Sequence, residues 1–153
     1  MKKIKICEMT TSHCDSVFDL QVRNKMDFGL NIWKSSELKE LLKKDQNFGR
    51  VFVFEKKIQG FCLFSASSEF LEIYTIFVDP FFRNNGVARY FLREGIKYCK
   101  KNVLKKIILE VNEINKLAIK LYKKNDFVLI GKRKNYYNIN GKLFDAILMQ
   151  LMI

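Results

Sequence analysis

The fold of this 153-residue chain is decided by the stretch Val78-Asp79-Pro80-Phe81-Phe82-Arg83-Asn84-Asn85-Gly86-Val87-Ala88. It follows an apolar and aromatic run, 70–78, which predicts a central strand covered on both faces. Apolar residues then recur every three or four positions, which predicts an amphipathic helix from Gly86 to about Lys101. The stretch is therefore the junction between a buried strand and the start of a helix.

This junction has the composition of an anion-binding site. The first N–H groups of a helix lack partners within the helix and carry a partial positive charge, so helix starts bind phosphate. Gly86 lets the backbone approach an anion, Arg83 adds a forked cation, and Asn84 and Asn85 tolerate left-handed backbone. An ordinary capped turn is the alternative interpretation. Neither the glycine–lysine phosphate loop nor the dinucleotide glycine fingerprint occurs.

The rest of the chain alternates between short β-runs and amphipathic segments without a repeat. We expect strands at 3–7, 51–55, 58–66, 107–111, 127–137 and 143–152, and helices from about Thr10 to Asn24, after Trp33 and around 117–122. Residues 25–32 are expected to form a loop, and Asn140-Gly141 a hairpin turn. This order predicts one α+β domain, residues 1–153, with a mixed, mostly antiparallel sheet of about seven strands and about four helices.

Composition excludes several classes of protein. There is no apolar run of the roughly 18 residues that a membrane helix needs and no signal peptide, so we expect a cytoplasmic protein without membrane contact. The four cysteines form no C-x-x-C pair and His13 is the single histidine, so no metal site and no Ser-His-Asp triad are expected. The net charge of +12 favours polyanions such as nucleic acid or a ribosome surface, or reflects only lysine-rich composition.

Three linked motifs resemble one family. The opening stretch is similar to V-D-P-x-x-[QR]-x-x-G-[IV]-[GA], the signature of the GCN5-related N-acetyltransferases (the GNAT family). Downstream, Leu109-Glu110-Val111, Asn115, Ala118 and Leu121-Tyr122 resemble a second run of the same family, in the same order. The resemblance covers essentially the whole chain. It implies a three-layer α/β/α fold and acetyl-CoA as the acyl donor, with no metal.

The resemblance also implies which residues hold that donor. Backbone groups of Ile76, Phe77 and Val78 would pair with the pantetheine arm and polarise the acetyl carbonyl, where negative charge develops during attack. Asn115 would contact coenzyme A from the following helix. The pyrophosphate would be held by Arg83, Asn84, Asn85, Gly86, Val87, Ala88 and Arg89.

Acetyl transfer to an amine needs a base for the amine and an acid for the departing thiolate. Glu110 is the lone acid of an apolar strand, although alternation could simply place it in solvent. Tyr122 lies on an apolar helical face, where a tyrosine can be no more than a core residue. The family resemblance implies that Glu110 is the general base and Tyr122 the general acid.

The tail of the chain resembles one subgroup, the bacterial ribosomal-protein alanine N-acetyltransferases (RimI-like). The segments that carry this resemblance are 131–137 and 145–149, with Trp33 ahead of a short helix. Trp33, Tyr136 and Tyr137 would shape the groove that admits a peptide terminus, although Tyr136 and Tyr137 could equally be packing residues. Ile32, Phe144 and 125–127 depart from the subgroup pattern.

The expected function is therefore acetyl-CoA-dependent acetylation of the N-terminal α-amine of a protein, a ribosomal protein by resemblance. An α-amine has a pKa near 7.7–8.0 against about 10.4 for lysine, so a modest base suffices. Two alternatives stay open: acetylation of a lysine side chain or small-molecule amine, and a basic RNA- or ribosome-binding module without catalysis. Nucleic acid is not expected as the substrate. The oligomeric state is not predicted.

Overall fold

The computed structural model describes residues 4–28 and 31–153, with backbone only at Phe28. The strands are β1 (Lys5–Glu8), β2 (Asn47–Phe54), β3 (Lys57–Ala66), β4 (Phe70–Val78), β5 (Lys106–Asn112), β6 (Val128–Ile139) and β7 (Lys142–Met152). The helices are α1 (Cys14–Arg23), α2 (Lys25–Phe28), α3 (Ser35–Leu42), α4 (Val87–Asn102) and α5 (Lys116–Lys124), with 3-10 turns η1 (Thr11–His13) and η2 (Pro80–Phe82).

The seven strands form one mixed sheet in the order β1-β2-β3-β4-β5-β7-β6. Neighbouring strands are antiparallel except β4 and β5, which are parallel. The β2-β3-β4 meander is confirmed, as is the hairpin at Asn140-Gly141, where both residues have positive φ. The α+β class and the seven-stranded sheet are therefore as predicted.

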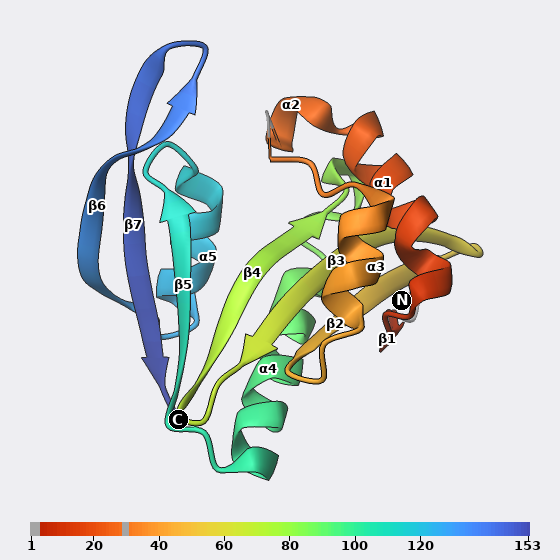
Figure 1. Ribbon diagram of the computed structural model, residues 1–153, viewed down its shortest axis with the longest axis horizontal. Coiled ribbons are helices and arrows are strands. Elements are labelled where there is room, and N and C mark those ends of the chain that lie inside the picture. The colour runs from red at the N-terminus through yellow and green to blue at the C-terminus, as the bar shows by residue number, and fades with distance from the viewer. Residues whose placement is uncertain (1–3, 29–30) are drawn as a thin grey trace.

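Helices cover both faces of the sheet and give it two cores (Figure 1). On one face α1 and α3 pack on strand residues that include Val51, Phe61 and Leu63. On the other face α4 packs on Phe64 and Leu71, and α5 adds Tyr122 to this core. The expected α/β/α layering is confirmed, and the two cores fix which way each strand residue faces.

The two parallel strands separate along their length. Residues Phe70–Ile73 of β4 pair with Lys106–Leu109 of β5, and no pairing between these strands continues beyond that point in the described residues. Figure 1 shows β4 and β5 meeting at one end and diverging at the other. In β4 a bulge leaves Tyr74 without a partner in β3, because Leu63 pairs with Thr75 and Phe64 with Ile73. We call the place where the backbones of β4 and β5 separate, beyond Ile73 and Leu109, the opening.

Two expectations about single elements were wrong. Residues 25–28 form α2 rather than the start of a loop, while residues 29–30 lie outside the described part of the chain. As a result the described residues contain five α-helices instead of about four. β4 is not covered on both faces, since Tyr74 is 41% exposed. The divergence from β5 explains the second error, because it removes the neighbouring strand along half of β4.

The ends of the chain's regular structure also bear on earlier expectations. The opening strand begins at Lys5 rather than residue 3, and residues 1–3 are not among those described. Among the described residues, no helix has the length and apolar character needed to cross a membrane.

Candidate functional site

Helix α4 follows the end of β4 that has separated from β5. Gly86 is its N-cap residue at φ +81°, and Asn84 also has positive φ, at +62°. Asn85 does not adopt this conformation, and its amide donates to the carbonyls of Phe82 and Arg83 at 3.2 and 3.0 Å. No side chain caps the helix, and its first turn contains no acidic residue. The first backbone N–H groups of this 16-residue helix carry the partial positive charge of the helix N-terminus, and no carboxylate in the first turn competes for them.

Arg83 has a structural role that the sequence did not predict. Its Nε donates to the Val78 carbonyl at 3.0 Å, and its Nη2 pairs with Asp27 Oδ2 at 3.1 Å. The guanidinium also lies 5.5 Å from the centre of the Phe77 ring. Arg83 therefore fastens the end of β4 to α2. In this arrangement two of its three nitrogens, Nε and Nη2, have partners within the protein.

Ile76, Phe77 and Val78 form the end of β4 that borders the opening. They pair with Cys62, Phe61 and Gly60 of β3 along one edge. Along the other edge no strand pairs with them in the described part of the sheet, since the β4–β5 register ends at Ile73 and Leu109. Strand backbone groups alternate in direction, so this edge of β4 points toward the opening and could pair with an extended ligand.

Glu110 is the first residue of β5 after its pairing with β4 ends at Leu109. The alternation Ile107, Leu109, Val111 faces the α4 core, so Glu110 projects from the opposite face, the one that carries α1 and α3. Its side chain is 24% exposed, and Oε1 pairs with Arg133 Nη2 at 3.1 Å. A half-buried carboxylate beside the opening is a suitable proton acceptor.

Tyr122 lies on the other face of the sheet from Glu110. It is buried in the core under α5, with its ring 5.5 Å from that of Phe127. Burial raises the pKa of the Tyr122 hydroxyl, and the nearby Cys62 and Tyr137 raise it further. The pKa of Tyr137 is also raised, by burial first and then by Glu110 and Tyr136. Tyr137 thus interacts electrostatically with both predicted catalytic residues, Glu110 and Tyr122, which lie on opposite faces of the sheet.

Asn115 is placed at the start of α5. Its Oδ1 accepts a hydrogen bond from the Ala118 N–H at 3.1 Å, which makes it the N-cap of the helix that carries Tyr122. The structure therefore gives Asn115 a positioning role, in addition to the cofactor contact that the sequence predicted.

The three predicted substrate-binding aromatics lie on both sides of the opening. Trp33 is held by Gln21, whose Oε1 accepts from the Trp33 N–H at 2.8 Å and whose Nε2 donates to its carbonyl at 3.0 Å. The Trp33 ring stacks on Tyr74 at 6.3 Å, on the β4 side. On the β6 side, Tyr136 is exposed and meets Tyr137 edge to face at 5.0 Å. The structure shows no direct contact between Trp33 and Tyr136 among the described residues.

Sequence reasoning missed three residues at this site: Arg133, Glu72 and Gln21. Glu72 lies opposite Ile108 in the β4–β5 register and interacts electrostatically with Glu110. The sequence pattern that could have found Glu72 is a single acidic residue between apolar residues of a strand, the same pattern that singled out Glu110. The pairing of Arg133 with Glu110 spans 23 positions and the intervening strand β7, and no local pattern indicates it.

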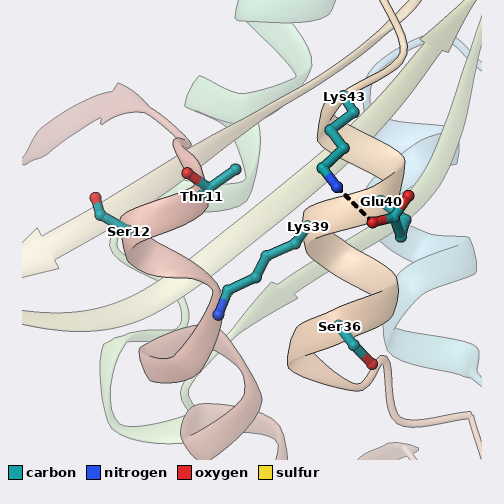
Figure 2. A pocket seen from close by; sticks show the side chains of 6 residues that line it. All are labelled: Thr11, Ser12, Ser36, Lys39, Glu40 and Lys43. Carbon is teal, nitrogen blue, oxygen red and sulfur yellow. Dashed lines mark hydrogen bonds and ion pairs between the residues drawn. The ribbon is translucent and has the colours of Figure 1, made fainter.

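A separate hollow lies between η1 and α3 (Figure 2). It is lined by Thr11, Ser12, Ser36, Lys39, Glu40 and Lys43. Lys43 and Glu40 pair with each other there at 2.6 Å, and none of the predicted site residues takes part. The hollow has no feature that would support acyl transfer. Within residues 4–28 and 31–153, no group of three or more His, Cys, Asp or Glu side chains could hold a metal ion.

Comparison with known proteins identifies the family. The family model described as "Acetyltransferase (GNAT) family" matches residues 15–127. A Bacillus subtilis protein, named as a ribosomal protein bS18-alanine N-acetyltransferase, is 28% identical over 153 residues, which cover 99% of this chain and 97% of that protein.

Two solved structures have the same fold. The crystal structure of the ribosomal-protein-S18-alanine N-acetyltransferase from Escherichia coli superposes with a TM-score of 0.86 at 22% identity, covering 99% of this chain and 94% of the other. Arabidopsis thaliana NAA60, crystallised with acetyl-CoA, superposes with a TM-score of 0.83 at 20% identity and covers 99% of both chains.

Proposed function

This chain belongs to the acetyltransferase (GNAT) family and is an acetyltransferase, and we propose that it transfers the acetyl group of acetyl-CoA to the N-terminal α-amine of a protein. The observation that carries this proposal is the opening between β4 and β5, with Glu110 on one face of the sheet and Tyr122 on the other. A proton acceptor and a proton donor on opposite sides of one opening fit a reaction in which an amine enters from one side and a thiol leaves from the other.

The start of α4 supports the choice of acyl donor. Coenzyme A carries a pyrophosphate, and the uncapped N–H groups after Gly86 form a site for such an anion. The open edge of β4 at 76–78 would accept the extended pantetheine arm by strand-like pairing. The similar fold of NAA60, crystallised with acetyl-CoA, agrees with this assignment.

In the proposed reaction the amine nitrogen forms a bond with the acetyl carbon, and the carbon–sulfur bond of the thioester breaks. Acetyl-CoA supplies the activated acyl group. Glu110 accepts the proton that the amine loses, and Tyr122 donates a proton to the departing sulfur. Its raised pKa keeps Tyr122 protonated at neutral pH, so it can serve as that donor. Backbone N–H groups of β4 near 76–78 would stabilise the negative charge on the acetyl oxygen.

The acceptor is proposed to be a protein N-terminus, and a ribosomal protein in particular. An α-amine is neutral in a larger fraction than a lysine side chain at physiological pH, which suits a single half-buried carboxylate as base. Trp33 on the β4 side and Tyr136 on the β6 side would bind the first residues of the peptide. The Bacillus subtilis relative, which is named for the alanine of ribosomal protein bS18, supports this class of acceptor.

A matched pair of peptides tests the proposal. Both begin with alanine and contain one internal lysine, and one of them has a chemically blocked N-terminus. With acetyl-CoA, the free peptide should gain one acetyl group on its first residue, and the blocked peptide should remain unmodified. Acetylation of the lysine in both peptides would contradict the proposal and favour a lysine acetyltransferase. The variant Glu110→Gln, assayed in parallel, should lose most of the transfer to the free peptide.

A further inference from the structure

Arg133 of β6 forms an ion pair with the proposed base, Glu110 of β5, across the strand β7. Arg133 lies opposite Ala146 of β7, and Ala146 lies opposite Asn112 of β5. Glu110 of β5 lies opposite Leu148 of β7. The Arg133 side chain must therefore cross β7 to reach β5, and the small side chain of Ala146 leaves room for it. Its Nη2 then meets Glu110 Oε1 at 3.1 Å.

The backbone around Arg133 is itself held in place. A bulge in β6 separates Arg133, opposite Ala146, from Tyr137, opposite Phe144. Within the bulge the Asn135 N–H donates to Asp145 Oδ1 at 2.9 Å, and the Asp145 N–H donates to Glu113 Oε1 at 2.8 Å. The bulged segment is thus tied to the end of β5, the strand that carries Glu110.

Three other groups interact with Glu110 or with the Arg133 guanidinium. Glu72 approaches from β4: burial raises the pKa of Glu72, the Glu110 carboxylate raises it further, and Arg133 lowers it. Tyr137 approaches from β6, and Tyr136 lies under Arg133 with the guanidinium 5.5 Å from its ring centre. Arg133 therefore interacts with both carboxylates, Glu110 by an ion pair and Glu72 electrostatically.

We propose that Arg133 is a positioning residue for acetyl transfer, which binds one oxygen of Glu110 and leaves the other oriented toward the incoming amine. This inference rests on the proposed role of Glu110 as the base. Arg133 Nη2 forms an ion pair with Oε1 at 3.1 Å, which leaves Oε2 as the oxygen that would accept the proton of the amine. A carboxylate fixed through one oxygen keeps a defined direction for the other, and such orientation is a recognised source of rate. Arg133 acts only through Glu110, without contact to the reacting atoms.

The test is a double-variant cycle on acetyl transfer to an alanine-starting peptide. Arg133→Gln should lower kcat about three- to tenfold, a modest loss because the Arg133 side chain is 54% exposed. The KM for acetyl-CoA should not change. In a Glu110→Gln background the same substitution should have no further effect, because its only route to the reaction has been removed. Arg133→Lys, which keeps the charge, should recover part of the rate.

Lys132→Gln is the matched control. It removes the same charge from the neighbouring position of β6, which points to the other face and pairs with Ile147 rather than Ala146. This variant should keep the wild-type kcat. A loss from Arg133→Gln that persists undiminished in the Glu110→Gln background would overturn the inference, as would an unchanged kcat in Arg133→Gln. If instead Glu110→Gln alone retains full kcat, the proposed base fails, and that outcome is distinct from the failure of Arg133.

Discussion

Gly86 offers a way to separate anion binding at α4 from the stability of the protein. Its φ of +81° is left-handed, and an added Cβ would meet no atom within 4 Å. Gly86→Ala therefore introduces backbone strain and no collision, at a cost of about 1–2 kcal/mol. For a chain of this length such a cost lowers Tm by about 2–8 °C. Gly86→Glu carries the same strain, partly offset by about 0.3–1 kcal/mol because a carboxylate favours a helix N-terminus.

Without ligand, Gly86→Glu should consequently be no less stable than Gly86→Ala. With coenzyme A the two should differ. At about 100 times its Kd, a ligand adds about 2.7 kcal/mol to the wild type, which corresponds to a rise in Tm of roughly 5–11 °C. The glutamate would place a negative charge where the pyrophosphate is expected, so this rise should disappear in Gly86→Glu.

Thermal denaturation with and without coenzyme A is the assay, and Gly141→Ala is its control. Gly141 has the same φ of +81° and the same open surroundings, but it lies in the β6–β7 hairpin. Gly141→Ala should lose comparable stability and keep the full shift with coenzyme A. The reasoning would be refuted if Gly86→Glu folded normally and still showed the wild-type shift.

Three further predictions concern residues around the opening. Tyr122→Phe should lower kcat by about a hundredfold and leave the coenzyme A shift intact, because the substitution removes only the hydroxyl and keeps the ring packed beside Phe127. An unchanged kcat would remove Tyr122 from the mechanism. The raised pKa of Glu72 means that the folded state holds this proton more tightly than the unfolded state, so the unfolding free energy falls as pH rises above the ordinary value of about 4.3. Glu72→Gln should therefore raise Tm at neutral pH and lose that advantage near pH 4, and a lower Tm at neutral pH would contradict the electrostatic account. Arg83→Lys should reduce the unfolding free energy by about 1–2 kcal/mol, since lysine cannot reproduce the contacts to both Val78 and Asp27, whereas Asp27→Asn removes only the ion pair. Urea unfolding measures both variants. A larger loss of unfolding free energy in Asp27→Asn than in Arg83→Lys would contradict this role of Arg83.

Much of the fold could be predicted because its signals are local. The helix predicted from Gly86 to about Lys101 is α4, and the turn at Asn140-Gly141 has the positive φ angles that the residue pair favours. The helix expected around 117–122 is α5, and Asp126, two residues after it ends, has the left-handed conformation. Alternation in 107–111 correctly placed Glu110 apart from its apolar neighbours.

What could not be predicted depends on contacts between distant parts of the chain. Asp27 of α2 pairs with Arg83, 56 positions later, and the sequence around residue 27 contains no sign of that partner. The early end of the β4–β5 pairing, which exposes Tyr74, is a property of the whole sheet. The sequence predicted Arg83 as a cation for a phosphate, and its contacts to Val78 and Asp27 were not visible in the local pattern.

The most direct test of this account is a crystal structure with a bisubstrate analogue, in which coenzyme A is joined through an acetyl linker to the α-amine of an alanine-starting peptide. The account predicts the pyrophosphate at the N–H groups after Gly86, and the linker between the Glu110 carboxylate and the Tyr122 hydroxyl. The peptide should leave the opening between Trp33 and Tyr136. A linker bound outside the β4–β5 opening, or a coenzyme A moiety that does not contact the start of α4, would contradict it.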